Sequence, residues 1–412
     1  MRIWIVNYYT RPDCSNPRYL EFAKHFMAKG WEVQTFYANY WEEQSSQFEV
    51  MKQDGLDFVK VKALNYGRST LKRMYSIWKF AQTIKKHANE FEKPDVVLHN
   101  VHAPFDYHIV MAAKKLDAKY ISEVWDLWPD NFANFGMISR RNPVMKVFYR
   151  MERWIYEHAD QLVFTISGAL QYLQDKGWTT KTGGKIDMSC VHYINNGVDL
   201  EQFDHDRDSY PRDDADMNRK DIFKVVYLGA ISFANHVQML IDAAALLQND
   251  TNYHFFIYGD GPQREGLEQY VKEKQIVNVH FKEKRIPLCE CAWVVSQATV
   301  NIMTYDARFG YMGVSSGKLF QYLAAGKPIV CNINIAYDNV IRDNELGVSE
   351  NISTPEALCQ AIRNCAEQPR YRYEGMCERV RKTAERFDYK NLAAEEIKVV
   401  EAALAKREEI EN

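Results

Sequence analysis

The sequence predicts an α/β fold with two doubly wound domains, because the same alternation of strands and helices opens each half of the chain. Near the start, "IWIV" has the composition of a buried strand, residues 16–29 form an amphipathic helical pattern that ends at Gly30, and "WEVQTFYA" indicates the next strand. From residue 222, "IFKVVYLGA", "HVQMLIDAAALLQ" and "YHFFIYGDG" repeat that order. A chain of 412 residues is also longer than one ordinary core supports.

Composition suggests where the domains begin and end. Further strands are indicated by "PDVVLHN", "AKYISEVWD" and "QLVFTIS" in the first half and by "NVHF", "TVNIMTY" and "KPIVCN" in the second. Residues 204–221 are polar and charged, as in a linker, and they divide an N-terminal domain, 1–203, from a C-terminal domain, 222–389. Residues 390–412 are rich in Ala and Glu, and we expect a helix there that packs back towards the N-terminal domain.

Charge and composition exclude several classes of protein. The net charge of -3 argues against a general nucleic-acid binder, which would be strongly basic. The apolar run at the N-terminus is too short for a signal peptide, and no segment approaches the roughly 18 apolar residues of a membrane span. The eight cysteines include no C-x-x-C pair, so reduced thiols and a cytoplasmic location are expected.

Three loops of the second half follow predicted strands and contain glycine. They are the turn at Gly229, "YGDGP" at 258–262, and "FGYMGVSSGKLFQYLAAGKPIV" at 309–330, which turns into a helix near Ser316 and carries Lys318. A helix N-terminus with an adjacent lysine suits an anion, and together the three loops would suit a nucleoside diphosphate. Each loop could also be an ordinary tight turn. No Walker A loop or G-x-G-x-x-G occurs, which disfavours ATP-loop and NAD-binding interpretations.

Several longer segments resemble one enzyme family. "YLGAISFANHVQMLIDAA", "FFIYGDGPQREGLE", "NVHFKEK" and "KLFQYLAAGKPIV" resemble the nucleotide-sugar domain of a retaining GT-B glycosyltransferase of family 4. "PDVVLHNVHAPF", "EVWDLWPD", "MERWIYEHADQLVFTISGALQYL" and "INNGVDLEQF" resemble its bacterial branch, which builds O-antigen, capsule and exopolysaccharide. The resemblance implies two Rossmann-like domains facing across a cleft and a metal-independent transfer with no cofactor besides the sugar donor.

The resemblance also implies a set of donor-binding positions, with departures from the family pattern. Ala230 and Asn235 stand where most members carry an Arg and a Lys, and Gly313 and Gln321 stand where many carry two glutamates. Lys318 thereby becomes the leading candidate for contact with the diphosphate, and an inactive pseudo-enzyme is the alternative. The expected donor-binding residues are Gly229, Ala230, Asn235, Gly259, Gly261, Gly313, Ser315, Ser316, Lys318, Leu319 and Gln321.

On the acceptor side, the resemblance points to "EVWDLWPD". Asp126 matches an acidic residue that can orient or deprotonate an acceptor hydroxyl, so Asp126 and Lys318 are the expected catalytic residues. Trp125 stands where many members have a histidine and could pack on a sugar. A buried turn with Asp126 capping a helix is the alternative. The expected acceptor-side residues are Arg18, His99, Asn100, Trp125 and Asp126.

Three histidines of the first half, His99, His102 and His108, lie close together in the sequence and suggest a metal cluster at first sight. Their position at a strand end and the metal-free character of the family favour packing or acceptor contact instead.

The expected partners follow from the same resemblance. Residues 68–86 hold six basic residues and no acidic one, interleaved with apolar residues, and the basic run at 140–153 is a candidate of the same kind. Such helices could lie on the inner face of an anionic membrane or could simply be solvated. We expect a hexosyl- or N-acetylhexosaminyl-type transferase that uses a nucleotide sugar, with UDP favoured over GDP, and a lipid-linked saccharide acceptor. The alternatives are a non-catalytic nucleotide-sugar-binding protein and a GT-B epimerase or phosphorylase.

Overall fold

The computed structural model describes the chain except residues 15, 68, 103, 135, 137, 251, 309–311 and 412, and it describes only the backbone of 104, 128 and 406–411. The chain divides into two compact units. The N-terminal unit holds Met1–Asn195 and Tyr389–Asn412, and the C-terminal unit holds Asn196–Asp388. Each unit is built on its own α/β sheet, as the sequence predicts.

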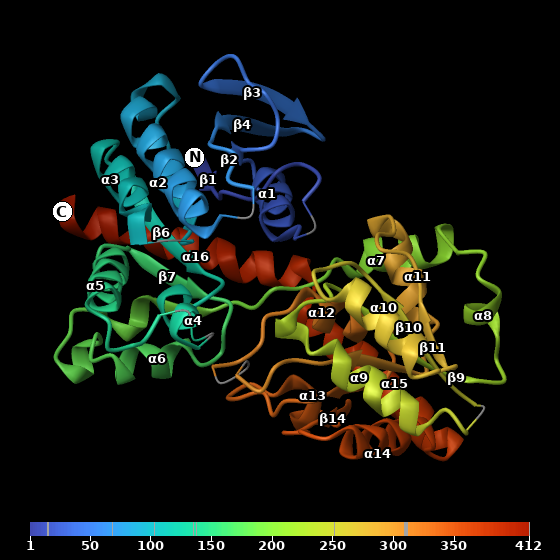
Figure 1. Ribbon diagram of the computed structural model, residues 1–412. Helices are drawn as coiled ribbons and strands as arrows, with labels where there is room; N and C mark the ends of the chain where they lie inside the picture. Colours follow the sequence, from blue (N-terminus) through green and yellow to red (C-terminus); the bar gives the residue numbers. More distant parts are fainter. Residues whose placement is uncertain are drawn as a thin grey trace. The chain divides into compact units, whose positions relative to one another are not determined.

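The sheet of the N-terminal unit has the strand order β3-β4-β2-β1-β5-β6-β7-β8 (Figure 1). Its strands are β1 (Arg2–Val6), β2 (Glu32–Asn39), β3 (Phe48–Gln53), β4 (Leu56–Lys62), β5 (Val96–Asn100), β6 (Lys119–Val124), β7 (Gln161–Phe164) and β8 (Val191–Tyr193). Neighbouring strands pair in parallel, except that β3 runs antiparallel to β4 at one edge. Parallel strands end at one edge of a sheet, and that edge is where ligands bind in such folds.

Helices cover both faces of this sheet. The helices are α1 (Arg18–Ala28), α2 (Thr70–His87), α3 (Tyr107–Lys115), α4 (Trp128–Asn134), α5 (Pro143–Glu157), α6 (Ala169–Asp175) and α16 (Tyr389–Glu411). Ile3 and Ile5 of β1 face a core that α1 and α16 close, while α2 and α3 lie on the other side (Figure 1). The expected C-terminal helix is therefore present as α16, and it packs on the N-terminal unit.

The sheet of the C-terminal unit is parallel, in the order β11-β10-β9-β12-β13-β14. Its strands are β9 (Phe223–Leu228), β10 (Tyr253–Tyr258), β11 (Val279–Phe281), β12 (Val300–Met303), β13 (Ile329–Cys331) and β14 (Gly347–Ser349). Its helices are α7 (Leu200–Ser209), α8 (Ala215–Asn218), α9 (Val237–Leu246), α10 (Arg264–Glu273), α11 (Leu288–Ser296), α12 (Gly317–Ala325), α13 (Val340–Asp343), α14 (Pro355–Ala366) and α15 (Arg370–Ala384). Because adjacent residues of β9 face opposite sides, Val225 packs with α9 and α14, and Val226 packs in a separate core with α11.

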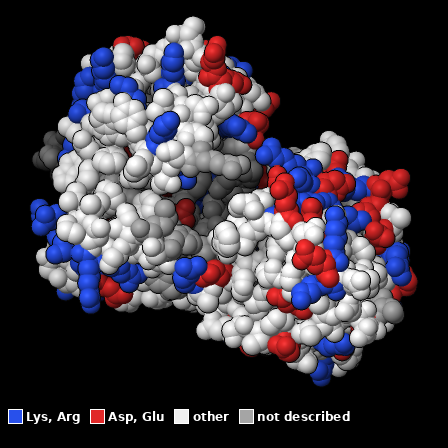
Figure 2. All heavy atoms as spheres, in the orientation of Figure 1, with Lys and Arg blue, Asp and Glu red and all other residues white. Residues whose placement is uncertain are grey.

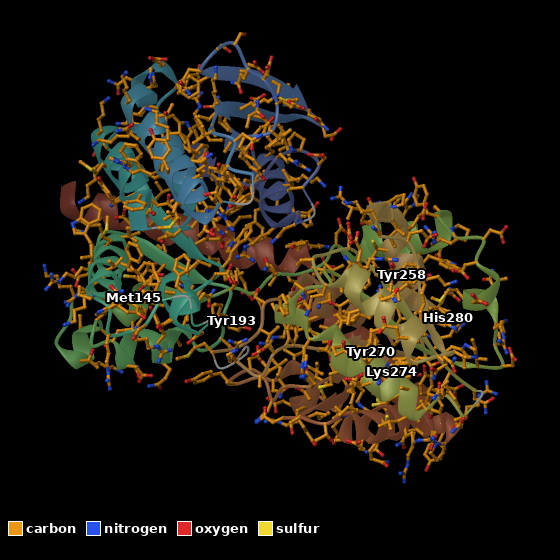
Figure 3. The ribbon with its side chains drawn as sticks, in the orientation of Figure 1. Met145, Tyr193, Tyr258, Tyr270, Lys274 and His280 are labelled. Atoms are coloured by element: carbon orange, nitrogen blue, oxygen red, sulfur yellow. The ribbon has the colours of Figure 1, made fainter. Side chains whose placement is uncertain are left out.

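The prediction that residues 204–221 form a linker between the domains is wrong. These residues belong to the C-terminal unit and include most of α7 and all of α8, and the division between the units falls at Asn195–Asn196 instead. Asp214 pairs with Lys282 (2.9 Å) and accepts a hydrogen bond from Tyr258, the last residue of β10 (Figure 3). Charged residues therefore hold the segment to the sheet that follows it, which its polar composition does not reveal.

Two searches of the described residues gave negative results. In that part of the chain, no helix combines the length and the apolar character that crossing a membrane requires. No group of three or more His, Cys, Asp or Glu residues is arranged there so that it could hold a metal ion.

Candidate active site

Two loops at the carboxyl edge of the C-terminal sheet pack backbone against backbone. The N–H of Gly229, after β9, donates to the carbonyl of Tyr258, and the N–H of Ile231 donates to Asp260 at 2.9 Å. Gly259 has φ +133°, and a Cβ there would lie 1.9 Å from the carbonyl oxygen of Gly229. Gly261 has φ +157°, and its Cβ would lie 2.3 Å from the oxygen of Ile231. Both glycines are therefore required by the packing of the two loops.

Lys318, in the first turn of α12, lies against these loops. Its Nζ donates hydrogen bonds to Oδ1 of Asn235 (2.8 Å) and to the hydroxyl of Tyr227 (3.3 Å). The same atom lies 4.7 Å from the ring centroid of Tyr227 and 5.0 Å from that of Tyr305. Its aliphatic stem packs on Gly229, where an added Cβ would lie 3.0 Å from Cδ of Lys318. We call Lys318, Asn235, Tyr227 and Tyr305 the Lys318 cluster.

The charge of Lys318 has no acidic partner in the described part of the chain, where the ion pairs include none to this residue. Burial lowers the pKa of Lys318 to about 8, so the ammonium form costs free energy where it stands. A partly buried cation held by neutral oxygens and aromatic faces is a site that an anion would stabilise. The cluster thus has the electrostatics of an anion-binding site.

The start of α12 adds backbone donors to this cluster. Ser316 is the N-cap residue, and the first N–H groups of a helix have no intrahelical acceptor. Ser315, just before it, accepts a hydrogen bond on its hydroxyl from the side chain of Asn196 (2.9 Å). Ser315, Ser316 and Gly313 are partly exposed, and Gly317 is exposed. Residues 309–311 of the quoted stretch lie outside the described residues.

Of the other expected donor residues, Ala230 and Gln321 are accessible to different degrees, whereas Leu319 is buried. Ala230 is exposed and its carbonyl accepts a hydrogen bond from Tyr227, while Gln321 is partly buried on α12. Leu319 is 1% exposed in the core, so its side chain cannot contact a ligand, and this expectation is corrected. Sequence reasoning missed Tyr227 and Tyr305, because an aromatic residue at a strand end has the same pattern as a core residue.

On the N-terminal unit, Asp126 follows β6 and is exposed. Desolvation by surrounding protein raises the pKa of its carboxyl group, against the opposing effects of a hydrogen bond with Asn131 and the charge of Arg73. Its neighbour Trp125 is partly buried, packs 5.2 Å from the ring of Tyr19, and donates its indole N–H to Glu123 (2.9 Å). Asp126 is thus accessible to a ligand, whereas the indole N–H of Trp125 is already engaged.

The structure does not support a contact between Arg18 and the acceptor. Its side chain is 0% exposed. The guanidinium donates to Glu123 over 2.6 Å and to the carbonyl of Asn195 over 2.6 Å. Arg18 is therefore a structural cation that connects α1, β6 and the last residue before the C-terminal unit. Its partners lie 105 and 177 residues away, so the sequence offers no local signal for them.

His99 and Asn100 end β5 and are buried, at 2% and 1% exposure. A ring nitrogen of His99 is hydrogen-bonded to the hydroxyl of Tyr120 (2.8 Å), and burial lowers its pKa well below the usual value. His108 is buried on α3, with both ring nitrogens lacking a partner in the described residues. Because the His99 ring is buried and hydrogen-bonded to Tyr120, direct contact with an acceptor is not available to it.

Comparison with known proteins places both units in one group of enzymes. A family model described as "Glycosyltransferase Family 4" matches residues 18–202, and one described as "Glycosyl transferases group 1" matches 222–368. The chain is 24% identical over 260 residues to "Probable glycosyltransferase WbjE" of Pseudomonas aeruginosa. It is 25% identical over 250 residues to "Putative glycosyltransferase EpsD" of Bacillus subtilis (strain 168). These alignments cover 61% and 58% of this chain and 61% and 60% of the relatives, so the chain matches less than two thirds of either.

Solved structures share the fold at low identity. Sucrose-phosphate synthase of Thermosynechococcus elongatus matches with a TM-score of 0.74 and 16% identity, over 98% of this chain and 99% of that one. HepE of Anabaena, solved in complex with UDP-glucose, matches with a TM-score of 0.65 and 13% identity, over 98% of this chain and 100% of that one. At such identities the likeness establishes the fold, which is GT-B, and the residues of the site have to be argued from their own chemistry.

Proposed function

The chain belongs to glycosyltransferase family 4 and has the GT-B fold, and from this premise we propose that it transfers a sugar from a nucleoside diphosphate sugar to a hydroxyl group. The sugar is of the hexosyl or N-acetylhexosaminyl type, and the anomeric configuration is retained. The acceptor is a lipid-linked saccharide in bacterial surface polysaccharide synthesis.

One observation carries the donor half of this proposal: Lys318 is a partly buried cation without a carboxylate partner in the described residues, and it lies in the first turn of α12. Departure of a nucleoside diphosphate leaves negative charge on its phosphoryl oxygens. A preorganised cation and helix N–H groups stabilise that charge without reorganising, which lowers the barrier. Lys318 and the turn at 315–317 supply both, so the transfer is proposed to need neither a metal nor another cofactor.

UDP is the proposed nucleotide. HepE of Anabaena, which shares the fold, was solved with UDP-glucose and with UDP alone. This supports a uridine nucleotide for the present chain without fixing the sugar.

In the acceptor half, Asp126 is proposed to orient the attacking hydroxyl. Its exposed carboxylate can accept a hydrogen bond from that hydroxyl, and the raised pKa makes the group a stronger base than an ordinary aspartate.

Because the proposed acceptor is lipid-linked, the proposal includes contact between the protein and a membrane surface. On α5, Val144 is 47% and Val147 49% exposed, and Lys146 and Arg150 are exposed beside them. On α2, Leu71 is 80% exposed next to Lys72. Lys and Arg side chains also gather over the region of α5 and α6 (Figure 2). Exposed apolar residues flanked by cations suit an anionic bilayer at the inner face of the cytoplasmic membrane.

The membrane part is tested by sedimentation with vesicles of phosphatidylglycerol or phosphatidylcholine. Binding only to the anionic vesicles, lost in Val144→Asp/Val147→Asp, is expected. The control is Val277→Asp/Leu288→Asp, which adds the same two negative charges at apolar residues of the C-terminal unit that are 72% and 61% exposed. Equal binding by both variants would remove α5 from the membrane contact.

The enzymatic part is tested by incubating the purified chain with a panel of UDP- and GDP-sugars and following nucleotide release and sugar products. Release of UDP, by hydrolysis or by transfer to saccharide acceptors, is expected. Nucleotide binding with no turnover of any donor would instead support a non-catalytic binding protein. Interconversion of free or nucleotide-linked sugars would identify an epimerase, and phosphate-dependent cleavage of a glycoside a phosphorylase.

A further inference from the structure

The carboxyl edge of the N-terminal sheet carries a row of aromatic rings. Tyr66 follows β4, Tyr40 follows β2, Tyr9 follows β1 and His102 follows β5, and these strands are neighbours in that order. We call these four residues the aromatic row. Side chains that follow adjacent parallel strands meet at one edge of the sheet, and the ring distances follow this order.

The rings of the aromatic row are in continuous contact. The ring centroids of Tyr66 and Tyr40 are 4.8 Å apart, those of Tyr40 and Tyr9 6.4 Å, and those of Tyr9 and His102 5.0 Å. The buried Tyr8 stacks on Tyr40 at 5.5 Å and forms the floor beneath it. All four members of the row are partly exposed, so the row is a surface rather than a core.

One uncompensated cation stands beside this row. Arg73 of α2 is exposed, donates from Nε to the hydroxyl of Tyr9 (2.9 Å) and lies 5.6 Å from that ring. The ion pairs of the described residues include none to Arg73. His102 adds no charge, because burial and the nearby Arg73 lower its pKa to about 3. Arg73 is thus anchored through one nitrogen, while its two terminal nitrogens donate to no acceptor among the described residues.

Asp126 lies at the far end of the same edge. It follows β6, the neighbour of β5 in the sheet, and the charge of Arg73 acts to lower the pKa of its carboxyl group. The edge therefore presents partly exposed aromatic rings, a guanidinium and the accessible carboxylate of Asp126 within one unit of the protein.

This combination has a definite chemical preference. The C–H faces of a pyranose ring carry partial positive charge and pack on the negative faces of aromatic rings. Phenol groups can also exchange hydrogen bonds with sugar hydroxyls. A guanidinium that is held in place presents its terminal N–H groups as a fork to phosphate or carboxylate oxygens.

We propose that the aromatic row binds the acceptor saccharide, and that the acceptor carries an anionic group, phosphoryl or carboxylate, which Arg73 binds. This inference rests on the proposed glycosyltransferase function and deepens it by naming the acceptor's chemistry. A phosphoryl group would come from the link between saccharide and lipid carrier, and a carboxylate would come from a uronate-type sugar. Asp126 then lies on the same edge to receive the hydroxyl that is glycosylated.

The test uses three soluble probes that share the gluco configuration: glucose 1-phosphate, glucuronate and methyl glucoside. Ligand-observed NMR with the full chain measures their binding, and a parallel titration with UDP reports on the C-terminal unit. At least one anionic probe is expected to bind more tightly than methyl glucoside. Preference for glucose 1-phosphate would indicate the lipid-linked phosphoryl group, and preference for glucuronate an acidic sugar.

The variants separate the two parts of the inference. Arg73→Gln is expected to weaken the anionic probe about tenfold or more while leaving UDP binding unchanged. Lys115→Gln is the matched control, since it removes an exposed charge from α3 of the same unit. Tyr40→Leu, checked for folding by circular dichroism, is expected to weaken all three probes.

Equal binding of charged and neutral probes, no binding of either anionic probe, or unchanged binding in Arg73→Gln would overturn the inference. Absence of UDP binding by the wild-type chain would instead count against the proposed function, so the two failures are distinguishable.

Discussion

Lys318 and Asn235 are joined by a 2.8 Å hydrogen bond from Nζ to Oδ1, although they lie 83 residues apart, one in the first turn of α12 and the other between β9 and α9. In the family pattern, cations stand at the positions of Ala230 and Asn235. Here an amide occupies one of them and positions the ammonium group of α12 instead. Asn235 and the hydroxyl of Tyr227 offer this partly buried charge only neutral acceptors, which leaves the charge available to an anion.

Lys318→Ala is expected to lower the rate of sugar transfer by a hundredfold or more, an effect of about 3 kcal/mol on the barrier. Steady-state rates of nucleotide release with a fixed donor check this. The matched control is Lys274→Ala. Lys274 also lies over a tyrosine ring, that of Tyr270 at 5.9 Å, but it is an exposed residue directly after α10 (Figure 3). Equal rates for wild type and Lys318→Ala would remove Lys318 from the mechanism.

Lys318→Met is expected to stabilise the donor-free protein by about 1 to 2 kcal/mol near neutral pH, because it removes a desolvated charge. The folded pKa of Lys318 is about 8, against 10.5 for the ordinary group. Between these two pKa values the unfolded chain binds more protons than the folded one. The free energy of unfolding of the wild type therefore increases as pH rises from about 8, and that of Lys318→Met does not show this increase. Urea unfolding of both proteins across that window measures the difference, and parallel curves would contradict it.

The affinity for the donor should also depend on the protonation of Lys318. It should fall as pH rises, whereas the stability of the protein increases. The ammonium form of Lys318 binds diphosphate, so the dissociation constant of UDP should be flat at lower pH and rise as pH passes about 8. Calorimetric titrations at several pH values test this, and the rise should be absent in Lys318→Met. A wild-type affinity that increases above that pH would exclude the ammonium group as the diphosphate ligand.

Gly259→Ala is expected to destabilise the protein and to abolish UDP binding, since the new Cβ would lie 1.9 Å from the carbonyl oxygen of Gly229. Gly266→Ala is the control: a Cβ at this helical position meets nothing within 4 Å, and alanine should stabilise α10 by about 0.5 to 1 kcal/mol. Thermal unfolding with and without UDP compares the two. Normal UDP binding by Gly259→Ala would show that the two loops are not as closely packed as described.

The alternation of strands and helices could be predicted because hydrophobic periodicity is a local property of the sequence. The antiparallel hairpin of β3 and β4 was missed, although Asp54 and Gly55, with φ of +50° and +81°, form a recognised hairpin turn pair. Its outer strand is largely exposed, with Glu49 and Lys52 among its residues, so the apolar run that marks the other strands is absent.

Residues of the candidate site were predictable where a loop follows a strand, and unpredictable where burial depends on distant partners. Lys318 was identified from its place at a helix start, whereas its tyrosine neighbours at strand ends were not. Arg18 was assigned to the acceptor side from its alignment with an arginine of the family, and nothing near it in the sequence indicates Glu123, the buried partner that occupies its guanidinium. A charged residue's role depends on its three-dimensional partners, which the sequence pattern does not specify.

Glu396 of α16 offers the last prediction, because it is a buried acid without a hydrogen bond among the described residues. Neither carboxyl oxygen has a hydrogen-bond partner in the described part of the chain, and the ion pair with Arg18 is long, at 3.9 Å, to a guanidinium already bound to Glu123. Burial raises the pKa of Glu396 well above its ordinary value, with the charge of Glu123 adding to the effect. Above the unfolded pKa of about 4.5, the folded protein therefore binds the extra proton, and stability is lost as pH rises towards the folded pKa.

Glu396→Gln removes that titration while keeping the side chain's shape. The variant should be more stable than wild type at neutral pH, with a difference that grows by at most about 1.4 kcal/mol per pH unit from about pH 4.5 upward. Glu395→Gln, at the exposed neighbouring position, should shift the curve little. Chemical unfolding over a pH series measures all three proteins. A stability difference that shrinks with rising pH would mean that Glu396 is ionised in the folded state, and Arg18 would then neutralise two carboxylates instead of one.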